Sequence, residues 1–183
     1  MNIVEPIRNE KDIEKIKNEL IKHNYRDYFL FLLGINTGLR LSILLNLKFK
    51  DFIIQGKNIS LNVNNIQFPL NASVKECFFT YKQRIGYKEP MVEDYIFASR
   101  KGHDPIDRSH AYRILSEAAK KVGLSSKVGT STLRKTFGYH FYKKYGDLKY
   151  LQKMFNHSSS KQTIKYIGIS EEDIPVSVIE LNL

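Results

Sequence analysis

The sequence of 183 residues predicts a mainly α fold with a small three-stranded antiparallel sheet (α+β). Two observations predict this class. Apolar residues recur three and four positions apart in the first 50 residues and again from about residue 107 onward, as they do along helices that bury one face. Between these regions, residues 52–70 form short apolar runs separated by turn residues, which is typical of strands. The length suffices for a sizeable core, and we expect residues 1–183 to form a single domain.

The first third of the chain predicts three helices. Residues 10–22 have an apolar stripe at helical spacing, and Asn9 can cap them. Residues 26–36 are apolar nearly all round, so their helix should be buried at the centre of the fold. Gly38 can end this helix in a left-handed conformation, and a third helix should begin at Leu41 and continue to about residue 47.

The middle of the chain predicts the sheet. Its three strands are expected at residues 52–54, 58–63 and 66–70. The pair Asn64-Asn65 suits a tight hairpin turn between the last two strands. A helix should follow at residues 72–84, capped by Asn71. It carries the single cysteine, Cys77, which excludes an internal disulfide and is interpreted as a small core residue.

The second half predicts an irregular segment followed by helices. Residues 86–107 contain Pro90, Gly102 and Pro105, with a short buried stretch at residues 95–98. Helices are expected at residues 107–122, 130–145, 148–155 and 159–167.

The positive charge is concentrated in one segment. The chain has a formal net charge of +10, and residues 100–165 hold 15 Lys and Arg against four Asp and Glu, a net of +11. Such a field suits a polyanion, most commonly nucleic acid. The alternative is a solvated lysine surface. No apolar run approaches the roughly 20 residues of a membrane span, and the N-terminus lacks an apolar signal core, so we expect a cytoplasmic protein.

Four residues have the chemistry that phosphodiester transfer needs. The oxygen of Tyr166 can attack phosphorus and hold a covalent intermediate. Arg40 and Arg134 can bind the phosphate oxygens, and His157 can donate to these oxygens or shuttle a proton. Each residue alone would more often be a surface ion-pair partner, a helix cap or a core aromatic. No carboxylate cluster is positioned for Mg²⁺, which argues against a two-metal nuclease.

Four motifs containing these residues resemble the catalytic domain of the tyrosine recombinase (phage integrase) family, and the match covers about residues 5–169. The first arginine motif is similar to residues 37–42, Thr-Gly-Leu-Arg-Leu-Ser. The His-x-Leu-Arg-His-Thr-Phe box is similar to residues 131–137, the Leu-Gly-His-Ser-Ser box to residues 155–159, and the nucleophile segment to residues 163–166.

This resemblance implies a site-specific DNA recombinase. Tyr166 would attack the scissile phosphate and form a 3′-phosphotyrosyl bond, while Arg40, Arg134 and His157 stabilise the transition state. Such a reaction needs neither metal nor any other cofactor. The implied partners are double-stranded DNA, other copies in a homotetramer that exchanges residues 171–183, and an accessory DNA-bending protein. The implied setting is the nucleoid of a bacterial cell, with an origin in a phage or mobile element.

The chain departs from the family pattern where protons are transferred. Ser131 replaces the second box's first histidine, and Asn64-Asn65 replace a lysine that serves as general acid. Lys57, at the preceding turn, is a substitute candidate for this acid. Ile43 replaces a common acidic residue. These losses favour an alternative, namely a catalytically degenerate relative that binds DNA but no longer cuts it. Such a protein would be a regulator or the remnant of a mobile element. Ser131 itself is interpreted as a helix cap rather than a catalytic substitute.

Members of the family usually carry an N-terminal helical domain that closes around DNA. Only about nine residues precede the first predicted helix here. We therefore expect weaker and more salt-sensitive DNA binding. A DNA-binding module of unrelated descent is a third interpretation, disfavoured by the order of the four motifs.

Overall fold

The computed structural model describes residues 4–56, 58–124 and 128–170. Two expectations fall outside these ranges, namely Lys57 as a proton donor and residues 171–183 as an exchanged tail. None of the helices in the described part of the chain is long and apolar enough to cross a membrane.

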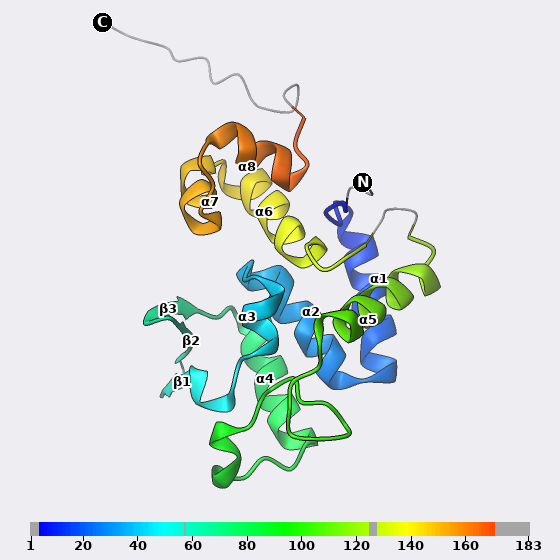
Figure 1. The fold of residues 1–183 in the computed structure, drawn as a ribbon, viewed down its shortest axis with the longest axis vertical. Helices are drawn as coiled ribbons and strands as arrows, with labels where there is room; N and C mark the ends of the chain where they lie inside the picture. The colour runs from blue at the N-terminus through cyan, green and yellow to red at the C-terminus, as the bar shows by residue number, and fades with distance from the viewer. Residues whose placement is uncertain (1–3, 57, 125–127, 171–183) are drawn as a thin grey trace, which may run out of the picture.

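Within the described ranges the fold is mainly helical with one small sheet, which confirms the predicted class (Figure 1). Every predicted helix and strand is present, with ends that agree to within two residues. The helices are α1 (Glu10–His23), α2 (Tyr25–Thr37), α3 (Leu41–Leu45), α4 (Ala72–Arg84), α5 (Arg108–Lys121), α6 (Thr132–Tyr145), α7 (Leu148–Phe155) and α8 (Ser160–Ile167). The strands are β1 (Phe52–Gln55), β2 (Asn58–Val63) and β3 (Ile66–Pro69), and short 3-10 helices lie at Phe49–Asp51 and Glu89–Glu93.

Local sequence signals set the helix starts as predicted. The Asn9 side chain accepts a hydrogen bond from the Lys11 amide at 2.9 Å, which caps α1. The Asn71 side chain accepts from the Val74 amide at 3.0 Å and caps α4. Each such cap typically stabilises its helix by about 1 kcal/mol.

The three strands form one antiparallel sheet in the order β1-β2-β3. Asn64 and Asn65 connect β2 to β3 with φ angles of 51° and 62°. Two successive left-handed residues give the twist that a two-residue hairpin needs, and asparagine tolerates this conformation better than most residues. The predicted turn is therefore confirmed.

The described residues form two hydrophobic clusters, and α6 contributes to both. The larger cluster surrounds α2, whose Phe29, Leu30 and Leu33 are fully buried. The smaller cluster lies among α6, α7 and α8, with Leu151 and Phe155 at its centre. Figure 1 shows α6–α8 grouped at one end of the molecule. Helix α6 packs against α2 and so joins this group to the larger cluster.

The N-terminal segment, residues 4–8, fastens the smaller cluster to the rest of the chain. The Ile7 amide donates to Thr136 Oγ1 of α6 at 2.9 Å. Arg8 Nη2 donates to the Gly168 carbonyl, immediately after α8, at 3.0 Å. The C-terminal end of α8, the helix that carries Tyr166, is thus held by Arg8.

Gly38 is required where α2 ends, and replacing it should destabilise the protein strongly. Gly38 has a φ of 62°, and a Cβ placed there would overlap the Phe137 ring of α6. We expect Gly38→Ala to lower the free energy of unfolding by about 2–4 kcal/mol, from left-handed strain and overpacking together. For a chain of this size the melting temperature should fall by about 5–15 °C, measurable by circular dichroism.

Gly56→Ala is the matched control for this substitution. Gly56 also has a left-handed φ, 59°, but a Cβ there would meet nothing within 4 Å. It should therefore show only the backbone part of the loss. Equal destabilisation by the two variants would contradict the close contact between Gly38 and Phe137.

Candidate active site

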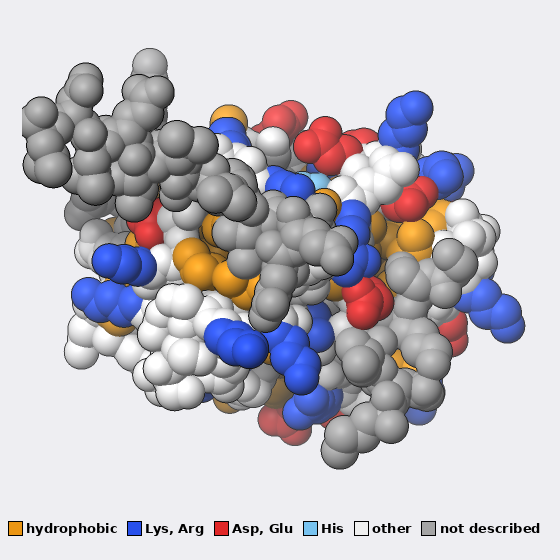
Figure 2. All heavy atoms as spheres, turned by 90° about the horizontal axis from the view of Figure 1, so that it is seen from above, with side chains coloured by type: hydrophobic (Ala, Val, Ile, Leu, Met, Phe, Trp, Pro, Cys, Tyr) orange, Lys and Arg blue, Asp and Glu red, His pale blue; other side chains and the backbone are white. Residues whose placement is uncertain are grey.

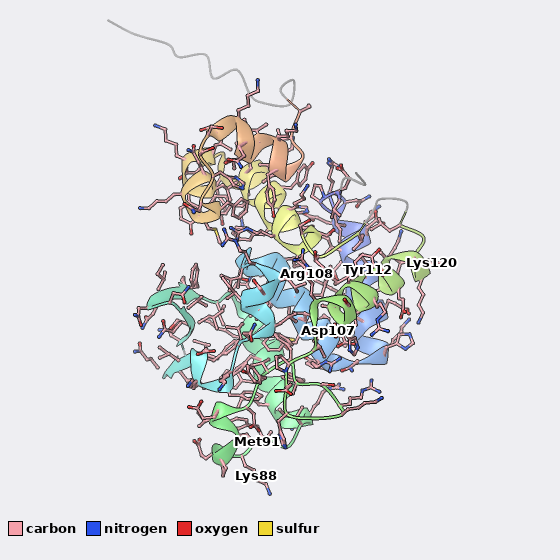
Figure 3. All side chains as sticks on the ribbon, viewed as in Figure 1. Lys88, Met91, Asp107, Arg108, Tyr112 and Lys120 are labelled. Carbon is pink, nitrogen blue, oxygen red and sulfur yellow. The ribbon has the colours of Figure 1, made fainter. Side chains whose placement is uncertain are left out.

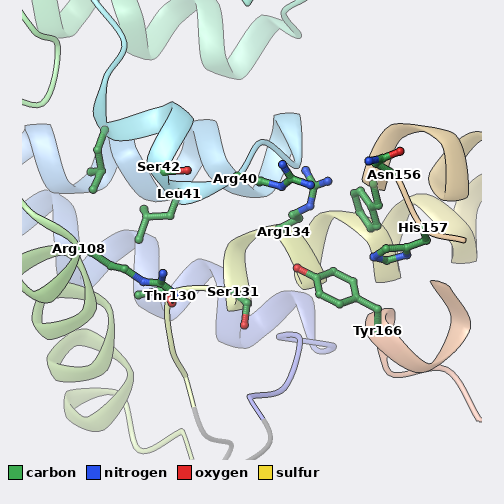
Figure 4. Close-up of a pocket in the computed structure, with 12 residues that line it drawn as sticks. Arg40, Leu41, Ser42, Arg108, Thr130, Ser131, Arg134, Asn156, His157 and Tyr166 are labelled. Carbon is green, nitrogen blue, oxygen red and sulfur yellow. Dashed lines mark hydrogen bonds between the residues drawn. The ribbon is translucent and has the colours of Figure 1, made fainter. Parts of the chain in front are cut away.

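One cleft of about 390 Å³ lies between α3 and the α6–α8 group (Figure 4). It brings together five of the six site residues predicted from the sequence, which are Arg40, Ser131, Arg134, His157 and Tyr166. The sixth, Lys57, lies outside the described residues.

Arg40 enters the cleft from the connection between α2 and α3. The left-handed Gly38 turns the chain, and Leu39 is buried beneath it. Arg40 takes the N-cap position of α3 with an extended backbone, and its side chain is exposed. The sequence Gly-Leu-Arg therefore serves to turn the chain, anchor it and present a cation to solvent.

Arg134 lies in the first turn of α6 and connects the other motifs. Its Nη1 donates to the Gly38 carbonyl, and its Nη2 donates to the Met154 carbonyl at 3.3 Å. Its guanidinium carbon lies 4.1 Å from the centroid of the Phe155 ring. Burial lowers the pKa of Arg134, but arginine starts so high that the side chain stays charged at neutral pH.

Three arginines line the cleft, and no Asp or Glu does so among the described residues. The third is Arg108 at the start of α5, whose Nη2 donates to Thr130 Oγ1 at 3.0 Å. The sequence does not reveal it, because no motif marks it and only the folded chain brings the start of α5 beside α3 and Thr130. Three cations with no carboxylate beside them in the described lining give this cleft the chemistry that suits an anion.

The surface charge outside the cleft is more mixed. Seen from the α6–α8 end, Lys and Arg side chains project from several sides of the molecule, with Asp and Glu between them (Figure 2). The cleft differs from this face because arginine is its sole charged lining residue within the described chain.

His157 is oriented by a chain of hydrogen bonds behind its ring. Its Nδ1 lies 3.0 Å from Thr163 Oγ1, and Thr163 Oγ1 donates to the Ser159 carbonyl at 3.2 Å. The Thr163 hydroxyl has a single proton, which it donates to the Ser159 carbonyl. In its hydrogen bond with His157 the hydroxyl oxygen must therefore accept, and Nδ1–H of His157 donates. Nε2 of the neutral ring is then an acceptor. Burial lowers the pKa of His157, and the charges of Arg134 and Arg40 lower it further.

Tyr166 projects from α8, and its hydroxyl points into the cleft toward Arg134 and Ser131 (Figure 4). Its ring lies edge-to-face with the His157 ring at a centroid distance of 5.0 Å. Burial raises the pKa of the Tyr166 phenol, and the nearby Arg134 and Arg40 charges act in the opposite direction. The phenol is therefore protonated at neutral pH and needs a proton acceptor to become a nucleophile.

Lys135, the residue after Arg134, lies on another side of Tyr166. Its Nζ is 5.1 Å from the Tyr166 ring centroid and donates to the Val4 carbonyl at 2.8 Å. Burial lowers the pKa of Lys135. The N-terminal segment thus also holds the cation that contacts the face of the Tyr166 ring.

Ser131 lies in the cleft, but its interpretation as a helix cap is wrong. It occupies the N-cap position of α6 with a helical backbone, and its hydroxyl makes no capping hydrogen bond. Thr132 Oγ1 instead accepts from the Gly129 amide at 2.9 Å and steadies this end of the helix. A capping hydroxyl favours an extended N-cap backbone, which Ser131 lacks.

The β2–β3 hairpin lies next to the cleft. A groove of about 320 Å³ is lined by Asn64 of the turn and by Ser42 and Ile43 of α3, and Ser42 also lines the cleft. Ile43 is half-buried and packs against the larger hydrophobic cluster. The turn position therefore approaches the cleft, although Asn64 has no titratable proton to offer.

We expect the His157 ring to titrate below pH 6.5, with its neutral form protonated on Nδ1. Burial and two positive charges disfavour the imidazolium, and the Thr163 hydrogen bond selects the tautomer. Arg40→Ala should raise the midpoint, because it removes one of the two charges. Long-range ¹H–¹⁵N NMR spectra recorded across the titration measure both properties.

The control for this titration is Lys11→Ala, which removes an exposed charge from α1, outside the cleft. It should leave the His157 midpoint unchanged. A midpoint at or above 6.5 in the unmodified protein, or no response to Arg40→Ala, would contradict the assigned electrostatics.

The arrangement of helices and sheet defines the class of this protein. The fold is that of the catalytic domain of tyrosine recombinases. It superposes on the crystal structure of XerA recombinase with a TM-score of 0.73 at 22% identity, covering 94% of this chain and 62% of that chain. It also superposes on XerH site-specific recombinase, bound to palindromic difH substrate in a post-cleavage complex, with a TM-score of 0.71 at 23% identity, covering 93% and 52%.

Sequence comparison then identifies the family. The chain belongs to the phage integrase family, whose profile matches residues 8–173. It is 42% identical over 177 residues to the "Probable integrase/recombinase YoeC" of Bacillus subtilis, covering 94% of this chain and 93% of that protein. The resemblance inferred from the four motifs is confirmed, and descent from an unrelated DNA-binding module is excluded.

Proposed function

We propose that this protein is a site-specific recombinase that breaks and rejoins double-stranded DNA through a phosphotyrosyl bond on Tyr166. One observation carries the proposal, which is that Tyr166, His157, Arg40 and Arg134 line a single cleft without a carboxylate among its described residues. Family membership and the similarity to a recombinase crystallised on its DNA substrate support the same activity.

In the proposed reaction, the Tyr166 oxygen attacks the scissile phosphorus and the bond from phosphorus to the 5′-oxygen breaks. The phenol loses one proton and the leaving 5′-oxygen gains one, so the step is neutral overall. Arg40 and Arg134 bind the two non-bridging oxygens as negative charge grows on them. A 5′-hydroxyl from a partner strand reverses the step and releases Tyr166, so no bond energy is lost.

We propose His157 as the proton acceptor for Tyr166, because both line the same cleft with their ring centroids 5.0 Å apart. The phenol is protonated at neutral pH because burial raises its pKa, whereas the pKa of His157 is lowered, so the ring is neutral. The hydrogen bond to Thr163 leaves Nε2 as the accepting nitrogen. General base assistance of this kind typically contributes about 10²–10⁴-fold in rate.

A suicide DNA substrate tests this proposal. Duplexes are first selected from a random-sequence pool by binding to the protein. A series of substrates is then made from them, in which the nick lies one nucleotide 3′ of a different candidate phosphate each time. The short fragment diffuses away after cleavage, so the Tyr166–DNA complex accumulates and is detected on a denaturing gel. Native mass measurement of the trapped complex also counts the copies assembled on DNA.

Tyr166→Phe is the control, because it keeps the ring and removes the nucleophilic oxygen. It should bind the same duplexes and give no covalent complex. If the unmodified protein binds selected duplexes but none of the nicked series traps it, the catalytic part of the proposal fails.

A second candidate function is favoured by the side chains at the two proton-transfer positions. Ser131 lies in the cleft where the family has a histidine, and Asn64 lies at the hairpin turn where the family has a lysine. A protein with intact arginines and neither proton donor would bind DNA and cut it slowly or not at all. Such a protein would act as a regulator or survive as a mobile-element remnant.

A further inference from the structure

Arg108 lies at the end of the cleft opposite the nucleophile. Figure 4 shows Arg108 and Thr130 at one end, Tyr166 and His157 at the other, and Ser131 between them. Figure 3 shows Arg108 at the start of α5, with Tyr112 and Lys120 farther along the same helix and away from this end. Only the first of these three side chains lines the cleft.

The Arg108 side chain is available to bind an anion. It is exposed, and no ion pair of at most 4 Å joins it to a carboxylate in the described part of the chain. Its hydrogen bond to Thr130 Oγ1, at 3.0 Å, uses one of five N–H donors and holds the guanidinium beside the cleft. The remaining donors can contact a phosphate in the two-pronged manner for which arginine is suited.

The direction of the proposed reaction places one particular phosphate near Arg108. In phosphoryl transfer the attacking and leaving oxygens lie roughly in line across phosphorus. With Tyr166 at one end and the scissile phosphate held between Arg40 and Arg134, the leaving 5′-oxygen points toward the Arg108 end. The next phosphate of the same strand lies beyond the leaving nucleoside on that side, so it is the phosphate that faces Arg108.

We infer that Arg108 is a substrate-positioning residue that binds the phosphate immediately 3′ of the leaving nucleoside. This inference rests on the proposed function, because that function fixes which side of the scissile phosphate faces Arg108. The contact holds the freed 5′-end within the cleft after cleavage. It thereby keeps the 5′-hydroxyl close to the phosphotyrosine, which strand rejoining requires.

A phosphate scan by equilibrium binding tests this inference without any cleavage. All proteins carry Tyr166→Phe, and the probes are duplexes selected from a random-sequence pool in which one phosphate at a time is replaced by a neutral methylphosphonate. Arg108→Ala should weaken binding to the unmodified duplex by about tenfold and lower the salt slope by about one. On one duplex, where the contacted phosphate is already neutral, Arg108→Ala should cost less than twofold.

We call the phosphate whose neutralisation removes the Arg108→Ala penalty the silent phosphate. Its position in the duplex is the decisive readout. Arg40→Ala, scanned in parallel, marks the scissile phosphate, and the silent position for Arg108→Ala should be its 3′ neighbour. Arg113→Ala is the matched control, since Arg113 is an exposed arginine on the same helix that does not line the cleft. It should keep its penalty, if it has one, at both of these phosphates.

Each outcome bears separately on Arg108 and on the proposed function. A silent phosphate 5′ of the scissile one, or an equal Arg108→Ala penalty on every duplex, would overturn the assignment even if the protein traps covalently. A third outcome is that the silent phosphate lies where expected but the unmodified protein forms no covalent complex. This result would support Arg108 as a phosphate contact and reject the catalytic function. Arg108→Gln should reproduce the coupling of Arg108→Ala, which excludes an effect of lost side-chain volume.

Discussion

Arg134→Lys should slow formation of the Tyr166–DNA bond by about 10²–10³-fold, the range typical of losing one donor to a developing oxyanion. Lysine keeps the charge but lacks the planar fork, so it cannot bind a phosphate oxygen while also donating to the carbonyls of Gly38 and Met154. The site would lose both a phosphate contact and the link from Gly38 of the first arginine motif to Met154, which directly precedes the His157 motif. Single-turnover trapping on a nicked duplex measures the rate.

The matched control is Arg113→Lys, the same exchange on an exposed arginine outside the cleft, which should change the rate less than twofold. Melting curves of both variants show whether a slower rate is caused by a less stable fold or by the loss of a phosphate contact. If Arg134→Lys stays within tenfold of the unmodified protein, the guanidinium does not have the role proposed for it.

Ser131→His combined with Asn64→Lys should increase the cleavage rate by about 10²-fold or more, because each restores a group that moves protons. Ser131 lies between Arg108 and Tyr166, and its hydroxyl makes no capping bond whose loss would weaken α6. Asn64 lines the groove beside the cleft, so a lysine stem can extend from there past Ser42. The left-handed backbone at Asn64, φ 51°, makes this second change costlier, by about 1–2 kcal/mol.

Ser131→Ala and Asn64→Gln are the controls, since they alter the same positions without adding a titratable group. Neither should speed cleavage. A strong gain in the double variant over a nearly inactive parent would identify a decayed recombinase. Rapid cleavage by the unmodified protein would exclude the non-cutting alternative and would show that residues other than these two transfer the protons.

Much of the fold could be predicted because its signals are local. Asn9 and Asn71 cap the helices that follow them, and the Asn64-Asn65 pair sets the hairpin. The burial of α2 follows from a sequence that is apolar nearly all round the helix. These features depend on neighbouring residues, so the order of side chains along the chain suffices to predict them.

The site was predictable only where residues belong to recognisable motifs. Arg40, Arg134, His157 and Tyr166 were found in this way, and the cleft brings them together. Arg108 and the Thr163 support of His157 were not found, because each depends on contacts that only the folded chain creates. The prediction for Ser131 is wrong, because a serine before a helix predicts a cap, whereas the backbone at Ser131 is already helical.

The N-terminal segment gives the molecule a particular order of assembly during synthesis. Its bonds from Ile7 to Thr136 and from Arg8 to Gly168 span 129 and 160 positions, so Ile7 and Arg8 can find these partners only long after they have been synthesised. At typical elongation rates of about 5–20 residues per second, synthesis of the intervening residues takes roughly 6–32 s. During that time α8 cannot be held by Arg8. The cleft stays incomplete until Tyr166 has been synthesised, so the growing polypeptide has no complete site for DNA.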